Sequence, residues 1–154
     1  MRRPATRHDP QPQHRLVIVD SSAVVAILFG EASVTALLET LATYAERLMS
    51  VANYVETGTV LAGRRHDERH GAIGDLNAFL DEAEIELASI DASQARVALD
   101  ARVRFGRGMG HGGVLNFGDA FAYALAKVNA APLLWVGDDF TMTDIAAALA
   151  VSRR

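Results

Sequence analysis

Apolar and polar positions along the chain predict strands that alternate with helices. Residues 16–19 form a short run of mostly β-branched side chains, typical of a buried parallel strand, and the apolar turns after it predict a helix over 23–28. Apolar residues then return every three or four positions over 32–45, which indicates a second helix. A short second strand is expected over 47–51.

The rest of the chain continues this alternation. The further expected elements are helices over 52–63, 76–83, 92–105 and 116–128 and strands over 85–90 and 133–136. Asp91 stands where an N-cap belongs, and 133–136 is expected to be the last strand. We therefore expect one α/β domain, with a central parallel sheet of about four to five short strands covered by helices on both faces.

Glycines crowd residues 106–113, between two of these helices, and predict a mobile loop. Gly108, Gly110 and Gly113 match the spacing of the dinucleotide-binding fingerprint. That fingerprint requires a preceding strand, whereas a helix precedes these glycines, so we reject this interpretation.

Composition favours one globular domain. The chain has 154 residues, of which 50% are hydrophobic and 22% charged, and it has no cysteine, so disulfides and thiolate metal sites are excluded. No apolar stretch is long enough to span a bilayer, which predicts a cytoplasmic protein without a membrane segment. Residues 1–15 hold several arginines and three prolines and are expected to be a disordered basic tail before a domain over 16–150. The alternatives are a basic arm that touches nucleic acid, or residues ahead of the true start.

The formal net charge of −4 does not favour an extended phosphate-binding surface. Carboxylates gathered around a divalent metal, however, lower the net charge without making the substrate face repulsive. The position of the acids therefore matters more than their number.

Acidic residues follow the predicted strands at their carboxyl ends. Asp20 follows the first strand, Asp138 and Asp139 follow the strand over 133–136, and Asp119 lies in the first turn of a helix. In a parallel sheet these positions converge at one edge, where ligands bind. Glu56 lies within an otherwise apolar helix, where an unpaired charge is costly unless a cation or hydrogen bond compensates it.

Carboxylates without cysteine or histidine suit Mg²⁺ or Mn²⁺, which prefer hard oxygen ligands. Each acid also has a simpler structural interpretation. Asp20 could cap the following helix, Asp119 could interact with the helix dipole, and Asp138 and Asp139 could be turn residues. Glu56 could form a buried ion pair with an arginine such as Arg102. Only the joint placement of these acids favours a metal site.

Four segments in this order resemble the motifs of PIN domains of the VapC toxin type. These segments are residues 17–26, 50–56, 115–126 and 133–140. The resemblance covers 16–150 and implies a PIN-like fold. The four acids that it assigns to the catalytic metal site are Asp20, Glu56, Asp119 and Asp139.

The resemblance implies a Mg²⁺- or Mn²⁺-dependent endoribonuclease that hydrolyses RNA phosphodiester bonds as the toxin of a toxin–antitoxin pair. Its expected partners are a VapB-like antitoxin and a second copy of the chain, with larger complexes formed with the antitoxin. Apolar faces of the helices over 32–45 and 52–63 are candidate contact surfaces, although core packing explains the same residues. Two other functions remain open: a metal-dependent phosphohydrolase of small phosphate esters, and a non-catalytic module that binds RNA or a partner.

For this site we expect Asp20 and Asp119 to be the core metal ligands and Asp139 a third acid. Glu56 would be a ligand or a base that orients water. The residues expected around these acids are Ser21 and Asn116 as orienting groups, Asp138 as the competitor of Asp139, and Asp144 as a further acid. Residues expected to meet the RNA backbone are Arg102, Arg104, Arg107 and His111, with an exposed flexible loop as the alternative.

Overall fold

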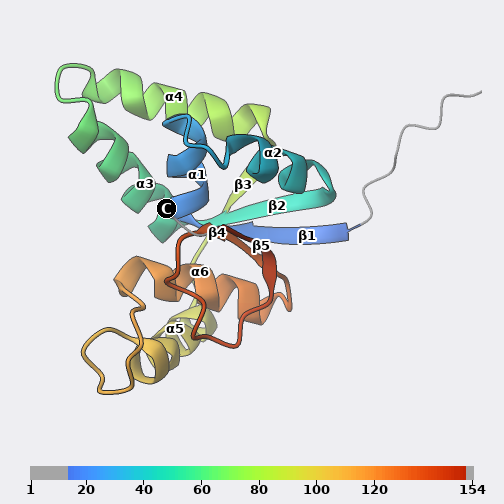
Figure 1. Cartoon of the computed structure of the whole chain (residues 1–154), viewed down its shortest axis with the longest axis vertical. Coiled ribbons are helices and arrows are strands. Elements are labelled where there is room, and N and C mark those ends of the chain that lie inside the picture. The colour runs from blue at the N-terminus through green and yellow to red at the C-terminus, as the bar shows by residue number, and fades with distance from the viewer. Residues whose placement is uncertain (1–13, 152–154) are drawn as a thin grey trace, which may run out of the picture.

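The computed structural model describes residues 14–151 and shows a parallel sheet between two layers of helices (Figure 1). The strands are β1 (His14–Val19), β2 (Tyr44–Ser50), β3 (Ile85–Ala88), β4 (Leu133–Val136) and β5 (Ala147–Val151), in the order β3-β2-β1-β4-β5. The helices are α1 (Ser21–Leu28), α2 (Val34–Ala42), α3 (Val51–Arg64), α4 (Arg69–Glu82), α5 (Ala92–Phe105) and α6 (Phe117–Val128). The predicted α/β class is confirmed. The segment 1–13, within the expected tail, lies outside the described residues.

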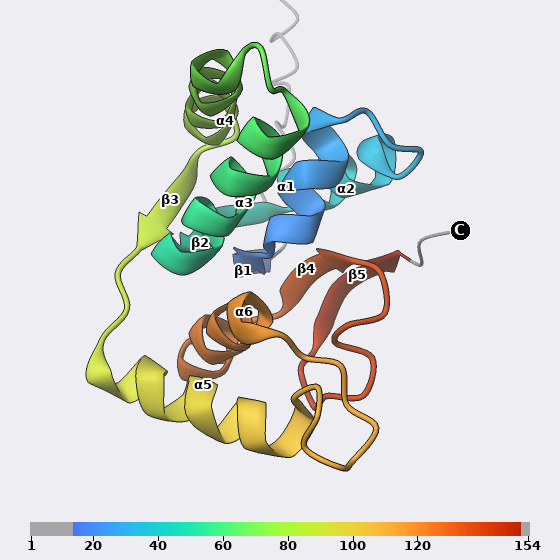
Figure 2. The same cartoon turned by 90° about the vertical axis from the view of Figure 1, so that its left-hand side faces the viewer.

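The sheet has an apolar core on each face because successive side chains of a strand point to opposite sides. Val17 and Val19 of β1 pack with α1, α2, α3 and α4, whereas Ile18 packs with α5 and α6. Figure 2 shows these two helix layers on either side of the strands. Burial on both faces explains why the central strands are nearly continuous apolar runs.

Two predicted element boundaries were wrong at the start of β2. The second helix ends at Ala42, whereas the pattern predicted a helix to residue 45, and β2 begins at Tyr44 rather than 47. Tyr44 is paired in parallel with His14 of β1, and Ala45, which was taken for part of the apolar face of the helix, is exposed. Strand pairing therefore overrides a helical spacing that continues by chance. β1 itself begins at His14, two residues before the predicted strand.

The strand over 133–136 is also not the last strand. β5 pairs in parallel with β4 and forms one edge of the sheet. Its sequence is rich in alanine, which has low strand propensity, so neither composition nor alternation indicated a strand. By contrast, the helix predicted over 92–105 has the predicted bounds, and Asp91 accepts a hydrogen bond from the Gln94 amide as its N-cap.

The carboxyl ends of β1, β2 and β4 lie at the same edge of the sheet because the three strands are parallel. α1 starts directly after β1, and α3 starts directly after β2. This edge is therefore formed by strand ends and helix starts, an arrangement common at ligand sites of α/β proteins. Within residues 14–151, no helix is long and apolar enough to cross a membrane.

We expect the Leu134→Ala substitution in β4 to lower the free energy of unfolding by about 2–5 kcal/mol. Leu134 is fully buried in the core that Val17 and Val19 form with α1 to α4. Its truncation therefore leaves a cavity that close packing does not fill. The urea midpoint of the purified protein measures the loss. Leu99→Ala is the control, because Leu99 is 67% exposed, and equal losses in the two variants would contradict this assignment of the core.

Candidate active site

Asp20 lies at the carboxyl end of β1 and is the N-cap of α1. Its Oδ2 accepts hydrogen bonds from the Ser22 amide at 3.0 Å and from the Ser22 hydroxyl at 2.6 Å. The Ser22 hydroxyl oxygen in turn accepts a hydrogen bond from the Val136 amide of β4 at 2.9 Å. Asp20 is buried, and its Oδ1 has no hydrogen-bond partner among the described residues. One carboxylate oxygen is thus fixed and the other is left without a partner.

Asp119 lies in the first turn of α6 and forms a capping box with Asn116. The Asp119 amide donates to the Asn116 side-chain oxygen at 2.8 Å, and the Asn116 amide donates to Asp119 Oδ2 at 2.9 Å. These two hydrogen bonds satisfy free amides at the start of the helix and hold the Asp119 side chain in place.

Glu56 of α3 lies against the start of α6. A Cβ built at Gly118 would overlap Glu56 Oε2, so the absence of a side chain at Gly118 makes room for this carboxylate. Asn53, one turn earlier in α3, is fully buried and donates hydrogen bonds to the Gly118 carbonyl oxygen and the Ser21 hydroxyl, both at 3.1 Å. Asn53 therefore joins α1, α3 and α6 beside the acids.

Asp139 lies in the segment after β4 and is exposed, as is Asp138. The charge of Asp139 acts on both Asp20 and Asp119, whereas that of Asp138 is not among the groups that shift either pKa. The structure therefore places Asp139 within electrostatic reach of both buried acids.

Burial and the negative charges of neighbouring acids raise the pKa of both buried acids. The pKa of Asp20 rises to about 6, chiefly through burial, although the hydrogen bonds from Ser22 oppose the rise. The pKa of Asp119 rises to about 8, through burial first and then through the negative charge of Asp20. Glu56 and Asp139 raise both pKa values further. The four acids thus lie close enough to act on one another.

Within residues 14–151, no three acidic or histidine side chains are already arranged to hold a metal ion. Two observations nevertheless fit a divalent cation at this edge. The buried Asp20 Oδ1 lacks a partner, and an isolated buried acceptor is costly. All four acids also supply carboxylate oxygens, the donors that Mg²⁺ and Mn²⁺ prefer.

Other predicted residues lie beside the site or away from it. Ser21 exchanges hydrogen bonds with Asn53, so Ser22 rather than Ser21 contacts Asp20. Asp144 accepts hydrogen bonds from Tyr123 and Lys127 and is not among the groups that shift the pKa of Asp20 or Asp119.

Two of the four basic residues predicted to contact RNA bond to other residues of the chain, and the other two are exposed. Arg102 donates a hydrogen bond to the Leu115 carbonyl oxygen, and among the described residues no ion pair joins it to Glu56, so that alternative is wrong. Arg104 pairs with Asp100 at 3.4 Å. Arg107 and His111 are exposed.

Sequence reasoning missed Asn53. The pattern marked its helix as mostly buried, and a carboxamide one turn before Glu56 was the available signal. A fully buried amide that bonds two other helices organises its surroundings, and its contacts depend on tertiary structure.

Residues 17–146 match the PIN domain family. The chain therefore belongs to the PIN-domain family, and the predicted resemblance to that family is confirmed.

Curated relatives place the chain more narrowly. It is 45% identical to Ribonuclease VapC42 of Mycobacterium tuberculosis over 129 residues, which cover 84% of this chain and 96% of the relative. It is 42% identical to Ribonuclease VapC28 of the same organism over 133 residues, covering 86% and 98%. The chain is thus a VapC ribonuclease, a hydrolase of the toxin–antitoxin class.

Solved structures agree on the fold. The M. tuberculosis VapC20 toxin, described as cleaving the sarcin-ricin loop, aligns with a TM-score of 0.67 at 18% identity, over 84% of this chain and 96% of its own. VapBC2 of Rickettsia felis aligns with a TM-score of 0.66 at 15% identity, over 86% and 96%. At these identities the likeness concerns the fold alone.

We expect the Asp119→Asn variant, in EDTA, to melt at a higher temperature than the wild type at pH 8, by about 2 °C or more. The pKa of Asp119 lies above its ordinary 3.8, so its ionisation between about pH 4 and pH 8 disfavours the folded state. Asparagine keeps an acceptor for the capping box but carries no charge. The difference should vanish near pH 4, and a difference independent of pH would contradict the assigned cause. Asp81→Asn, at an exposed acid of α4, is the control.

Gly118→Ala should displace the Glu56 carboxylate, because the new methyl group would occupy the position of Oε2. We expect Mn²⁺ affinity, measured by calorimetry, to fall by about tenfold or more. Gly74→Ala is a matched control in α4, since a Cβ there meets nothing within 4 Å. Unchanged Mn²⁺ affinity in a folded Gly118→Ala protein would show that this packing is unimportant for the site.

Proposed function

We propose that this VapC ribonuclease is an endonuclease that hydrolyses RNA phosphodiester bonds with the help of Mg²⁺ or Mn²⁺, held by Asp20, Glu56, Asp119 and Asp139. The observation that carries the proposal is the placement of Asp20 and Asp119, buried within reach of each other's charge. A protein gains nothing in stability from two such neighbours. A bound divalent cation attracts both carboxylates and so offsets the repulsion between them.

The residues of the chain divide the work of the site. Ser22 fixes one oxygen of Asp20 and leaves Oδ1 free for a ligand. Asn116 holds Asp119 through the capping box, so its side chain needs no rearrangement before binding. When bound, the cation would polarise the phosphate and lower the pKa of a bound water molecule. Glu56 would then act as a ligand or orient the attacking water.

We propose that basic residues in and beside the glycine loop at 106–113 contact the RNA backbone. Arg107 and His111 are exposed and are the candidates that remain, with Arg104 held near its exposed partner Asp100. The bond from Arg102 to Leu115 supports a structural role for Arg102, which would brace the loop.

A VapB-like antitoxin and a second copy of the chain are the proposed protein partners. Solved structures with this fold include VapBC2 of R. felis and a toxin–antitoxin complex from Klebsiella pneumoniae, the latter with a TM-score of 0.62 at 15% identity. Leu38 of α2 and Val55 of α3 are 42% and 63% exposed, so both helices predicted as contact surfaces present apolar side chains. We also propose a cytoplasmic location, where the RNA substrate would be available.

The decisive experiment is cleavage of a mixed tRNA and rRNA pool by the purified protein with Mg²⁺, Mn²⁺ or EDTA. We expect metal-dependent cutting that Asp119→Asn reduces by at least ~100-fold, since the variant loses one of the charges that bind the cation. Circular dichroism verifies that the variant folds. Metal-dependent turnover of a small phosphodiester without any cutting of RNA would instead identify a phosphohydrolase.

Asp138 and Asp139 form a matched pair of neighbouring exposed acids. We expect Asp139→Asn to lower the rate of RNA cleavage by about tenfold or more, and Asp138→Asn by less than about twofold, because the charge of Asp139 is among those that raise the pKa of both buried acids. Single-turnover kinetics at saturating Mg²⁺ compares the two variants. The reverse order would assign the fourth acidic position to Asp138.

A further inference from the structure

The segment between β4 and β5 carries Asp139, which is exposed and in itself unanchored. Its neighbour Phe140 is 2% exposed and packs against Trp135 of β4, with ring centroids 5.4 Å apart. This contact ties the residue that follows Asp139 to the sheet. A contact between this segment and α6 would in addition fix the position of Asp139 relative to Asp119, which α6 carries.

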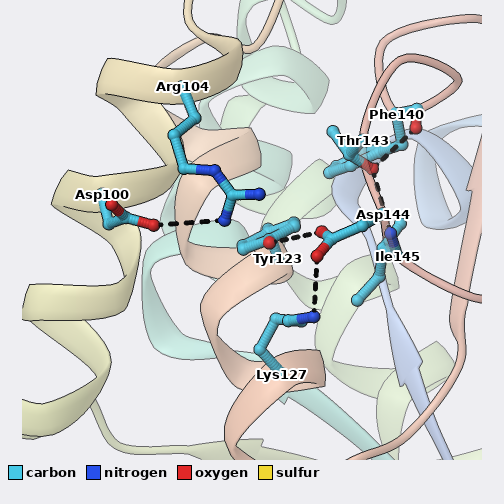
Figure 3. A network of polar contacts seen from close by, with 8 residues as sticks. All are labelled: Asp100, Arg104, Tyr123, Lys127, Phe140, Thr143, Asp144 and Ile145. Carbon is cyan, nitrogen blue, oxygen red and sulfur yellow. Dashed lines mark hydrogen bonds and ion pairs between the residues drawn. The ribbon is translucent and has the colours of Figure 1, made fainter.

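Asp144 supplies that second anchor (Figure 3). The Tyr123 hydroxyl of α6 donates a hydrogen bond to Asp144 Oδ1 at 2.5 Å, and Lys127 Nζ donates to Oδ2 at 3.0 Å. Tyr123 is 1% exposed, and its ring lies 5.8 Å from that of Phe105. Burial, together with the bond to Asp144, raises the pKa of Tyr123, so its hydroxyl stays protonated as a donor.

Hydrogen bonds within the segment connect the two anchors. The Thr143 hydroxyl donates to the Phe140 carbonyl oxygen at 2.7 Å and accepts from the Ile145 amide at 3.3 Å. The Thr141 hydroxyl donates to the Asp138 carbonyl oxygen, also at 2.7 Å. The backbone is therefore braced from one side of Asp139 to Asp144.

The second anchor lies on the helix that also carries Asp119. Tyr123 follows Asp119 by four residues, about one turn of α6. A single rigid helix thus presents one acid directly and holds the segment that presents another. Any movement of the segment relative to α6 changes the distance between Asp119 and Asp139.

We propose that Tyr123 and Asp144 are positioning residues, whose hydrogen bond fixes the position of Asp139 relative to Asp119 and Asp20. This role rests on the proposed metal-binding function of Asp139. In this proposal Asp144 does not bind the metal itself but anchors the segment that carries Asp139. Lys127 is exposed and strengthens the anchor only slightly, as surface ion pairs do.

The test is the Mn²⁺ affinity of the full chain carrying Tyr123→Phe, measured by calorimetry. This substitution keeps the buried ring and removes only the hydroxyl. We expect affinity to fall about 3- to 10-fold, less than the loss typical of a group bonded directly to a metal ligand. Tyr54→Phe is the control, since it also removes one hydrogen bond between elements, from Tyr54 to Asn77 at 2.9 Å. The control should bind Mn²⁺ within twofold of the wild type.

A second arm separates positioning from general destabilisation. In an Asp139→Asn background, Tyr123→Phe should cause no further loss of Mn²⁺ affinity, because its effect passes through Asp139. The same fold-loss in both backgrounds, or none in either, would overturn the inference, as would an Asp139→Asn variant that binds like the wild type. If the wild type binds no Mn²⁺, the proposed function itself fails and the inference with it. Intact binding that is sensitive to Asp119→Asn but not to Tyr123→Phe rejects the inference alone.

Discussion

Two carboxylates buried beside each other are the constraint on which the rest of the structure depends. Asp20 and Asp119 come from different elements, and the negative charge of Asp20 raises the pKa of Asp119. A rigid frame keeps these groups together although burial and nearby negative charges raise their pKa values and favour their protonated forms. The frame consists of hydrogen bonds that start on the acids themselves: Ser22 joins Asp20 to β4, and Asn116 ties Asp119 to the first turn of α6.

The fold serves this constraint through its parallel order. β1 is central, and both of its neighbours end at the same edge, so short connections are enough to bring α1, α3 and the segment after β4 together. Asn53 then links three helices beneath the acids, and the bond between Tyr123 and Asp144 holds the last segment against α6. Apolar packing on both faces makes the frame stiff, and polar contacts at one edge of the sheet hold the acidic side chains in place.

Local signals determined how much could be predicted from the sequence. The run over 16–19 and the cap at Asp91 are encoded by adjacent residues, and both elements were found. β5 was missed because its alanine-rich sequence becomes a strand only by pairing with β4. The four candidate acids were predicted from their places after strands and in helices together with the family resemblance, and their assignment to a metal site stays a prediction. The contact of Ser22 rather than Ser21 with Asp20 was not predicted, since adjacent serines differ only in the direction of their side chains once α1 has formed.

The long sequence distance within the site has a consequence for synthesis of the protein. Val136 of β4 holds Ser22, which holds Asp20, so contacts at the first acid depend on a residue more than a hundred positions later. A chain growing on the ribosome has Asp20 and Glu56 long before it has β4. The hydrogen bonds that fix Asp20 therefore cannot form until β4 has been synthesised, so this part of the site is completed late in translation.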